Sequence, residues 1–380
     1  MNTIAIKLFT LTAVLQMSLC PQDKERLRFS RDIAVTLSTS KYDPSSLGYI
    51  QRGNTGFLHY FNTADTTIDL LNLASGATEK IPLSKMDSLH PATMNFFYCY
   101  LNPDSIFCLF KKSKTICLID ESGEVKCAWR VKQELPGGIS NYALAAYWTM
   151  PMKYHSGKLY LMAIRTDIVI NNLPDIRKYF ETPQSLTLDI SGEEAGIVSL
   201  TGDWPGLYRS DRVYQDVHAQ RCVNKNGEML FAFAVDDQVY LYSGKQTQTA
   251  NAKSSSFVMP PAFPLDSAYN FNYIDKYLIE SCRYRSIIYD PYRDLYYRIA
   301  EKGIPYESPD GMTVRQQDDK PFSILVLDKD LNLLREQPFD PAEYLVHYII
   351  PIPEGLLVSK RIRKKHEKNE LLFSLFDLSE

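Results

Sequence analysis

The densest group of side chains that could do chemistry lies between residues 283 and 298, where arginines and tyrosines alternate with carboxylates. The candidate ligand-binding residues here are Arg283, Arg285, Tyr289, Asp290, Tyr292, Arg293 and Tyr296. Tyrosine rings can stack on a sugar or peptide while arginine and aspartate make directed hydrogen bonds, so the pattern indicates a binding surface. An alternative is a hairpin turn at residues 290–293, fixed by aspartate and proline, with arginines bound to neighbouring backbone carbonyls. Trp148 and Trp204 are further candidate stacking platforms.

Short motifs for nucleophilic, metal or phosphate chemistry are not found in the sequence. It contains no Gly-x-Ser-x-Gly, no His-Glu-x-x-His, no phosphate-binding glycine loop and no Cys-x-x-Cys. The six histidines are scattered, and only His218 has a nearby acid, Asp216, that would share its face of a strand. A structural or surface role is the simpler interpretation of that pair. We therefore predict no metal site and no cofactor, and we assign no catalytic residue.

Four cysteines recur at nearly even spacing, and tight turns between them would align all four in one row across a sheet. They are Cys99, Cys108, Cys117 and Cys127. A row of four strands spans about 14 Å, which is too long for one tetrahedral ion with bonds of ~2.3 Å to sulfur. The row is then either a set of small buried side chains or the site of a cross-strand disulfide. Cys222 and Cys282 could form another disulfide.

The elements that must position these residues are strands. The chain has 380 residues, 45% of them hydrophobic and 12% aromatic, and segments rich in tyrosine and β-branched residues recur along its length. The clearest unit is 95–131, in which turns at 102–104, 111–114 and 121–124 separate four such segments. This pattern predicts a four-stranded antiparallel meander, the size of one propeller blade.

Five further units follow the same pattern and begin near residues 47, 157, 227, 287 and 345. The last unit has three strands, and segment 27–37 is a spare strand that would complete it and remove its exposed edge. The predicted fold is an all-β, six-bladed β-propeller closed by this N-terminal strand. Seven blades remain an alternative, because 277–282 looks like an extra strand without a place. Residues 174–180 predict a short helix, and 301–321 form a long polar insertion.

The N-terminus is typical of a secretory signal, with a single lysine before an apolar run at residues 8–19. The run is too short for a transmembrane helix, which needs ~20 apolar residues. Cys20 follows directly and resembles the lipidated cysteine of a bacterial lipoprotein, although Leu19 stands where such signals place a small residue. We expect 1–20 to be the signal and 21–380 one exported propeller domain, attached to the outer membrane through lipid on Cys20. A free or trimmed cysteine beside an ordinary cleavage site is the alternative.

Charge argues against a nucleic-acid partner. The formal net charge is −3 and the isoelectric point is about 6.1, whereas nucleic-acid-binding proteins usually carry a basic face. The one basic run, 360–366, is either a solvated hairpin turn or a patch for an anionic partner.

The stretch from Tyr289 to Arg298, together with the lipoprotein-like start and the repeated units, is similar to a Bacteroidetes family of propeller lipoproteins, domain of unknown function 4221. The resemblance implies a propeller of six or seven blades in the cell envelope and supplies no catalytic residues. We therefore predict a non-catalytic envelope lipoprotein that binds a glycan, peptide or protein partner on one propeller face. A glycan hydrolase or lyase with carboxylates near the axis, and a structural subunit of an envelope complex, are the alternatives.

Overall fold

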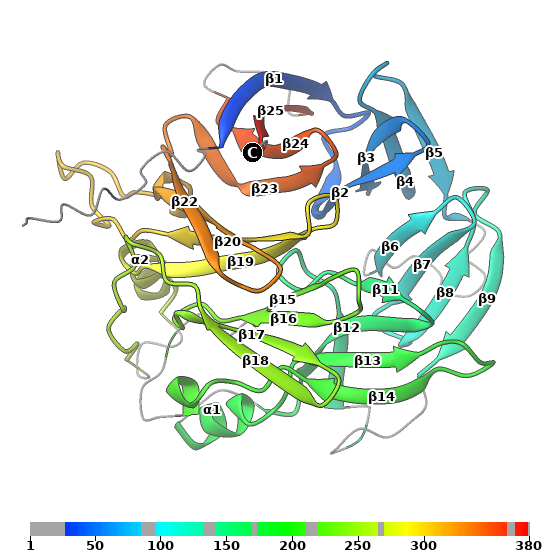
Figure 1. Cartoon of the computed structure of the whole chain (residues 1–380), viewed down its shortest axis with the longest axis horizontal. Coiled ribbons are helices and arrows are strands. Elements are labelled where there is room, and N and C mark those ends of the chain that lie inside the picture. The colour runs from blue at the N-terminus through cyan, green and yellow to red at the C-terminus, as the bar shows by residue number, and fades with distance from the viewer. Residues whose placement is uncertain are drawn as a thin grey trace, which may run out of the picture.

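Figure 1 shows the computed structural model, in which β-sheets are arranged in a ring. The structure describes residues 27–84, 96–131, 138, 141–168, 173–209, 214, 219–264, 270–362 and 369–378. The predicted signal with Cys20, and the pair Asp216 and His218, lie outside these residues. Over the described residues the strands form six sheets, so the chain is a six-bladed propeller.

Each blade is an antiparallel meander in which consecutive strands pair. The first blade contains β2 (Tyr42–Arg52), β3 (Thr55–Asn62), β4 (Thr67–Asn72) and β5 (Thr78–Pro82). The second contains β6 (Phe96–Asn102), β7 (Ser105–Phe110), β8 (Thr115–Ile119) and β9 (Val125–Arg130). The third contains β10 (Tyr142–Ala145), β11 (Lys153–His155), β12 (Lys158–Arg165), β13 (Ser185–Asp189) and β14 (Gly196–Thr201).

The remaining blades follow the same plan. The fourth contains β15 (Gln220–Val223), β16 (Met229–Ala232), β17 (Gln238–Ser243) and β18 (Gln246–Asn251). The fifth contains β19 (Arg283–Asp290), β20 (Leu295–Glu301), β21 (Phe322–Leu327) and β22 (Leu333–Phe339). The sixth contains β23 (Tyr344–Ile352), β24 (Gly355–Lys360), β25 (Glu370–Asp377) and, from the other end of the chain, β1 (Arg28–Thr36).

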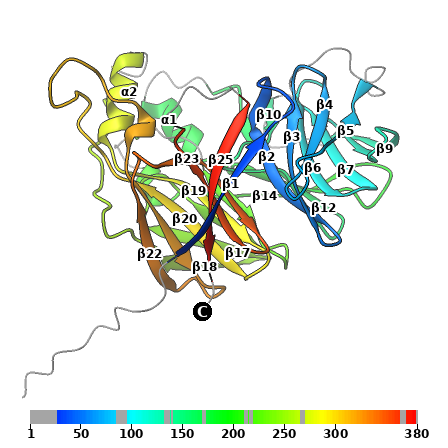
Figure 2. The ribbon, with the colours of Figure 1, turned by 90° about the horizontal axis from the view of Figure 1, so that it is seen from above.

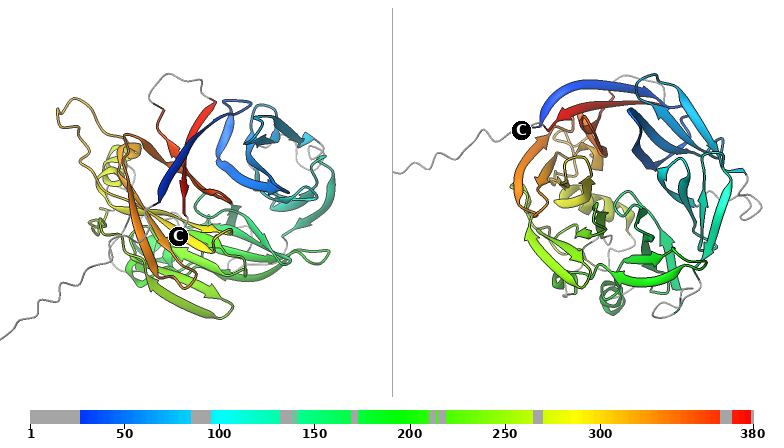
Figure 3. Two further views of the ribbon diagram at one scale, coloured as in Figure 1. Left: turned by 45° about the horizontal axis from the view of Figure 1, so that its top comes forward. Right: turned by 45° about the vertical axis from the view of Figure 1, so that its right-hand side comes forward.

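The N-terminal strand closes the ring, as predicted. β1 pairs antiparallel with β25 along nearly its whole length, and Val35 lies opposite Leu371. Figure 3 shows the completed sixth blade beside the first blade from two further directions. The pairing covers the outer edge of β25, which would otherwise present unpaired backbone groups to solvent.

The blades are held together by apolar clusters, and six of those clusters each lie between two neighbouring blades in the described part of the chain. The middle strands are buried on both faces and are therefore almost continuously apolar. β21, with sequence FSILVL, is buried at every position. The outermost strand β18, with sequence QTQTAN, is exposed at nearly every position. This gradient from centre to rim explains why the strand pattern is so clear in the sequence.

One predicted element is wrong. Segment 277–282, taken as an unplaced strand, belongs largely to α2 (Phe271–Glu280). The side chain of Asn270 begins this helix by accepting a hydrogen bond from the backbone N–H of Tyr273. A short apolar run fits the repeat of a helix as well as that of a strand. The Asn270 cap is the sequence signal that would have indicated a helix. The helix predicted at 174–180 is confirmed as α1 (Leu173–Phe180), and Figure 2 shows both helices on the same side of the ring.

The predicted row of four cysteines is also wrong. Cys108 does lie opposite Cys117. However, register shifts near residue 101 and between residues 118 and 119 displace Cys99 and Cys127 by one position from the row. Side chains alternate between the two faces of a strand, so a one-residue shift moves a side chain to the other face. All six described cysteines are free thiols, and the disulfides considered from the sequence are not formed among them.

Candidate functional site

A cavity of about 740 Å³ lies at the axis of the ring, and residues from all six blades line it. Its wall is built mainly from the innermost strands β2, β6, β15, β19 and β23, and from residues 146–153 of the third blade. These innermost strands follow one another around the axis. Neighbouring strands are in contact, namely β2 with β6, β6 with β11, β15 with β19, β19 with β23, and β23 with β2. A volume of this size lies within the range of about 300–1,000 Å³ that small-molecule sites occupy.

Tyrosine dominates the cavity wall. Among the described residues, the tyrosines that line it are Tyr49, Tyr98, Tyr100, Tyr147, Tyr289, Tyr292 and Tyr348. Burial raises the pKa of the Tyr292 phenol to about 12, and it also raises the pKa of Tyr49 and Tyr98. These phenols therefore stay protonated at neutral pH, so each can both donate and accept a hydrogen bond. The wall can offer aromatic faces and neutral polar groups together.

The third blade contributes an unusual feature, because its innermost strand is interrupted between β10 and β11. Tyr147 and Met150 pair across the tight turn that fills the interruption. The turn carries Trp148 to the fifth blade, where the guanidinium of Arg285 lies 4.9 Å from the indole ring centre. Trp148 remains 41% exposed, so a large part of its surface is accessible to a ligand.

Arg285 is held in place from behind by a buried carboxylate. Its Nη1 donates to Glu301 at 2.8 Å, and Arg283 Nε donates to the other oxygen of the same carboxylate at 2.5 Å. Lys320 Nζ lies 3.4 Å from Glu301 and donates to the backbone carbonyls of Leu278 and Ser281. Burial alone would raise the pKa of Glu301, but the surrounding cations hold it well below its usual range.

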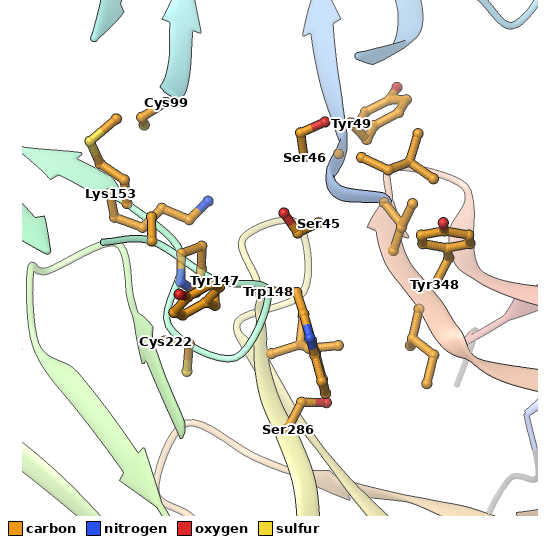
Figure 4. A pocket seen from close by; sticks show the side chains of 18 of the residues that line it. Ser45, Ser46, Tyr49, Cys99, Tyr147, Trp148, Lys153, Cys222, Ser286 and Tyr348 are labelled. Carbon is orange, nitrogen blue, oxygen red and sulfur yellow. The ribbon is translucent and has the colours of Figure 1, made fainter. Parts of the chain in front are cut away.

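Charged side chains are few on the wall, and most have a partner. Lys225 pairs with Asp294 at 2.7 Å. Asp43 accepts hydrogen bonds from the backbone N–H and the hydroxyl of Ser45. Lys153 differs, because the described residues contain no carboxylate in ion-pair contact with it. Figure 4 shows its side chain reaching into the cavity toward the side where Ser45 lies.

His59 also lines this wall and is partly buried. Its Nδ1 lies 2.8 Å from the Tyr98 hydroxyl. Burial, with a smaller contribution from the positive charge of Lys153, lowers the pKa of His59 to about 3. The imidazole is therefore neutral at physiological pH and serves as a hydrogen-bond partner for Tyr98.

Four of the residues predicted to bind a ligand line the cavity. Arg285, Tyr289 and Tyr292 come from the fifth blade, and Trp148 comes from the third. Residues 137 positions apart in sequence, Trp148 and Arg285, thus meet in the fold. Whether these residues bind a ligand stays a prediction.

The other predicted positions are structural. Asp290 is fully buried and accepts hydrogen bonds from the Tyr297 hydroxyl and the backbone N–H of Tyr292. Arg293 donates to the backbone carbonyls of Ile352 and Pro353 and so ties the fifth blade to the sixth. The alternative interpretation of this stretch, a turn fixed by aspartate with arginine bound to carbonyls, therefore describes these two residues correctly.

Arg283, Tyr296 and Trp204 are also corrections to the predicted surface. Arg283 and Tyr296 are buried, the first against Glu301 and the second between the fourth and fifth blades. Trp204 is 2% exposed and packs against the ring of Phe180 from α1. The sequence places this tryptophan in a loop, but the loop folds back between the third and fourth blades, where the indole is part of the core.

Sequence reasoning missed the residues that complete the wall: Ser45, Tyr49, Tyr98, Lys153 and Tyr348. A signal for them existed, because tyrosine recurs on the first strand of several predicted units. In a propeller the first strand of each blade lies nearest the axis, so these recurring positions predict a shared lining. No comparable signal marked Lys153, which lies just after the interruption of its strand.

Within the described residues, no group of three or more histidine, cysteine, aspartate or glutamate side chains is placed to hold a metal ion. Among the described helices, none is both long enough and apolar enough to span a bilayer.

Comparison with known proteins agrees with this architecture. The profile of a domain of unknown function, DUF4221, matches residues 22–338. The crystal structure of a DUF4221 member from Bacteroides vulgatus is 21% identical, covers 93% of this chain and 98% of that chain, and superposes with a TM-score of 0.72. A Bacteroides fragilis protein, named as a candidate exported protein, is 11% identical and covers 91% and 95% of the two chains with a TM-score of 0.49. A comparison with curated proteins finds no match.

Proposed function

Since this chain belongs to the DUF4221 family, we propose that it is a non-catalytic binding protein of the cell envelope whose central cavity takes a short glycan. The proposal includes export through residues 1–20 and attachment to the outer membrane by lipid on Cys20. Its main support is the axial cavity of about 740 Å³ with a wall of tyrosines and one half-exposed tryptophan.

Aromatic side chains that also carry polar groups suit sugars better than they suit most other small ligands. A sugar ring has an apolar face that stacks on an indole or phenol ring, and hydroxyls around its edge that need hydrogen-bond partners. Trp148 offers the face, and Arg285 beneath it is fixed by Glu301, so little side-chain freedom is lost when a ligand stacks there. The hydroxyls of Tyr49 and Tyr348 on the same wall supply such partners, and the Tyr348 hydroxyl also lies 3.2 Å from that of Tyr42.

Binding is favoured over glycan hydrolysis by the distribution of carboxylates. Most glycosidases place two carboxyl groups about 5–9.5 Å apart across the scissile bond. Among the described residues of the wall, Asp43 is the single carboxylate, and Ser45 already donates two hydrogen bonds to it. A hydrolase or lyase at this cavity would have to work without a second acid on the wall.

The test is a thermal-shift screen of residues 21–380 against bacterial and host oligosaccharides, followed by calorimetry on each hit. Removing residues 1–20 takes away none of the described fold. Trp148→Ala is expected to weaken binding about tenfold or more, because stacking and apolar contact are lost together. The control is Tyr273→Ala, at a residue exposed to a similar degree on α2 and away from the cavity wall.

The outcomes separate the competing functions. Saturable binding that Trp148→Ala weakens and Tyr273→Ala leaves unchanged supports the proposal. Product formation from a bound glycan would replace it with a hydrolase or lyase. If no sugar of the panel changes the melting temperature, glycan binding is refuted, and a peptide or protein partner or a structural role in an envelope complex is favoured.

Anchoring is tested separately. Cells expressing the full chain are labelled with a radioactive or clickable palmitate, and the wild type is compared with Cys20→Ala. The anchor is supported if Cys20→Ala neither incorporates the lipid label nor is found in the membrane fraction. Equal labelling of the two proteins refutes it.

A further inference from the structure

Lys153 is the first residue of β11, three positions after the turn at residues 147–150 that carries Trp148, and its side chain is exposed and lines the cavity. Figure 4 shows the ammonium group directed away from its own strand and across the cavity toward Ser45. Lys153 and Trp148 come from the same short segment of the third blade and line the same cavity, so we expect a ligand that stacks on Trp148 to come within reach of the ammonium group.

The described groups on which the charge of Lys153 acts carry no opposite charge. Its charge acts on His59, Cys99 and Cys222, which come from three different blades. Burial raises the pKa of Cys222 to about 12 and raises that of Cys99, so both remain thiols at neutral pH, and His59 is neutral. Within the described part of the chain, Lys153 therefore presents its positive charge among neutral groups, of which Cys222 is buried and His59 and Cys99 are partly buried.

The other cations of the wall are in a different state. Lys225 is paired with Asp294 at 2.7 Å, and Arg285 is paired with Glu301 at 2.8 Å. The wall's carboxylate, Asp43, is engaged by Ser45. The hydrogen bonds from Ser45 come from a neutral residue, so they do not compensate a charge. Of the lysines and arginines described on the wall, Lys153 is the one without an ion-pair partner among the described residues.

We propose that the glycan carries an acidic group, a carboxylate or a sulfate, which binds the ammonium group of Lys153. This inference rests on the proposed function and specifies its ligand as an acidic saccharide. A charge-assisted hydrogen bond between ammonium and an acidic oxygen is about twice as strong as a neutral one. The hydroxyl of Ser45, which donates to Asp43, keeps lone pairs that can accept from a sugar hydroxyl on the opposite side.

The test uses matched acidic and neutral sugars. Calorimetry compares tetragalacturonate with its methyl ester, and lactose 3′-sulfate with lactose, at low and at physiological salt. Inorganic sulfate is titrated as a separate probe. We expect the acidic member of at least one pair to bind at least tenfold more tightly than its neutral partner, and we expect this advantage to shrink as salt increases.

Three variants identify the residue. Lys153→Met removes the charge and keeps most of the length, so it should lose the advantage of the acidic sugar. Lys153→Arg keeps the charge and should keep at least part of that advantage. Lys329→Met makes the same change of net charge at an exposed lysine that pairs with Asp330 outside the cavity wall, and it should change affinity less than twofold. Melting temperatures confirm that each variant is folded.

The outcomes distinguish this inference from the proposed function. Equal affinity for acidic and neutral sugars overturns the inference and leaves glycan binding intact. An acidic preference that survives Lys153→Met also overturns it. Binding of none of the sugars overturns both. Sulfate binding that disappears in Lys153→Met, without any sugar binding, keeps an anion site at Lys153 but refutes the glycan.

Discussion

Replacing Glu301 by glutamine removes a charge while it preserves shape, so it tests the buried cluster that supports Arg285. The Glu301 carboxylate is completely buried, and so is the Lys320 ammonium group. Arg283 and Arg285 are only slightly exposed. In the wild type these cations share one carboxylate. In Glu301→Gln the two arginines retain their charges and lose the group that compensates them, and Lys320, whose pKa burial already lowers to about 8, loses the carboxylate that raises it.

The expected cost is large. Removing one partner of a buried ion pair destabilises a protein by about 3–5 kcal/mol, because the remaining charge is buried without compensation. Glutamine fills the same volume, so no cavity adds to this figure. A loss of that size is a large part of the free energy of unfolding of a typical domain, which is about 5–15 kcal/mol.

The effect should also depend on pH. The pKa of Glu301 in the folded chain lies well below its ordinary value of 4.5. A lowered carboxyl pKa stabilises the fold above the unfolded-state pKa of about 4.3, and this stabilisation is lost as the pH falls toward the folded-state pKa. The difference in stability between wild type and Glu301→Gln should therefore shrink below pH 4, where the wild type loses this stabilisation.

The assay is urea unfolding at 25 °C followed by tryptophan fluorescence, with reversibility checked. The control is Glu307→Gln, the same substitution at an exposed residue six positions along the chain, which should change stability by less than about 0.5 kcal/mol. Adding Lys320→Met to Glu301→Gln removes one uncompensated cation and should restore part of the loss. If the free energy of unfolding of Glu301→Gln lay within about 0.5 kcal/mol of that of Glu307→Gln, the reasoning would be refuted.

Three further predictions concern closure, thiols and contacts between blades. Leu37→Ala leaves a cavity between the sixth and first blades and should lower the free energy of unfolding in urea by about 2–5 kcal/mol. The control is Phe29→Ala at an exposed residue, and an equally small loss in both variants would contradict the prediction. Burial raises the pKa of Cys117 to about 11 and that of Cys222 to about 12. Iodoacetamide at pH 8 should therefore label both thiols only after denaturation, as measured by mass spectrometry, and rapid labelling of the native protein would disprove this. Arg298→Met should cost at least about 3 kcal/mol, because the buried guanidinium donates to several backbone carbonyls of the fourth blade; an unchanged urea midpoint would count against it.

The fold was accessible from sequence because its signals are local. Each blade consists of consecutive strands joined by short turns, and buried strands such as β21 are apolar at nearly every position. Even the long-range pairing of β1 with β25 could be predicted, since a three-stranded last unit and a spare first strand have one economical arrangement. The errors arose where local patterns fit two structures, as for residues 277–282, or where a single register shift moved a cysteine to the other face.

The candidate site was only partly accessible, because aromatic and charged residues have the same sequence signature in a core and in a cavity. Trp148 and Trp204 are alike as loop tryptophans in the sequence, yet one is half exposed at the axis and the other is buried between blades. Arg285 and Arg293 differ in the same way, the first lining the cavity and the second binding carbonyls of the sixth blade.

The sequence by itself determined a ring of antiparallel meanders, its closure by the first strand, and a supply of tyrosines on the strands that lie innermost. These features depend on the period of apolar residues and on turn chemistry, which act over a few residues at a time. Only the tertiary structure decided which side chains converge at the axis and which charge there is left uncompensated. Trp148, Lys153 and Arg285 line one cavity because six blades close into a ring, and among the described residues Arg285 has a buried carboxylate as its partner whereas Lys153 has none.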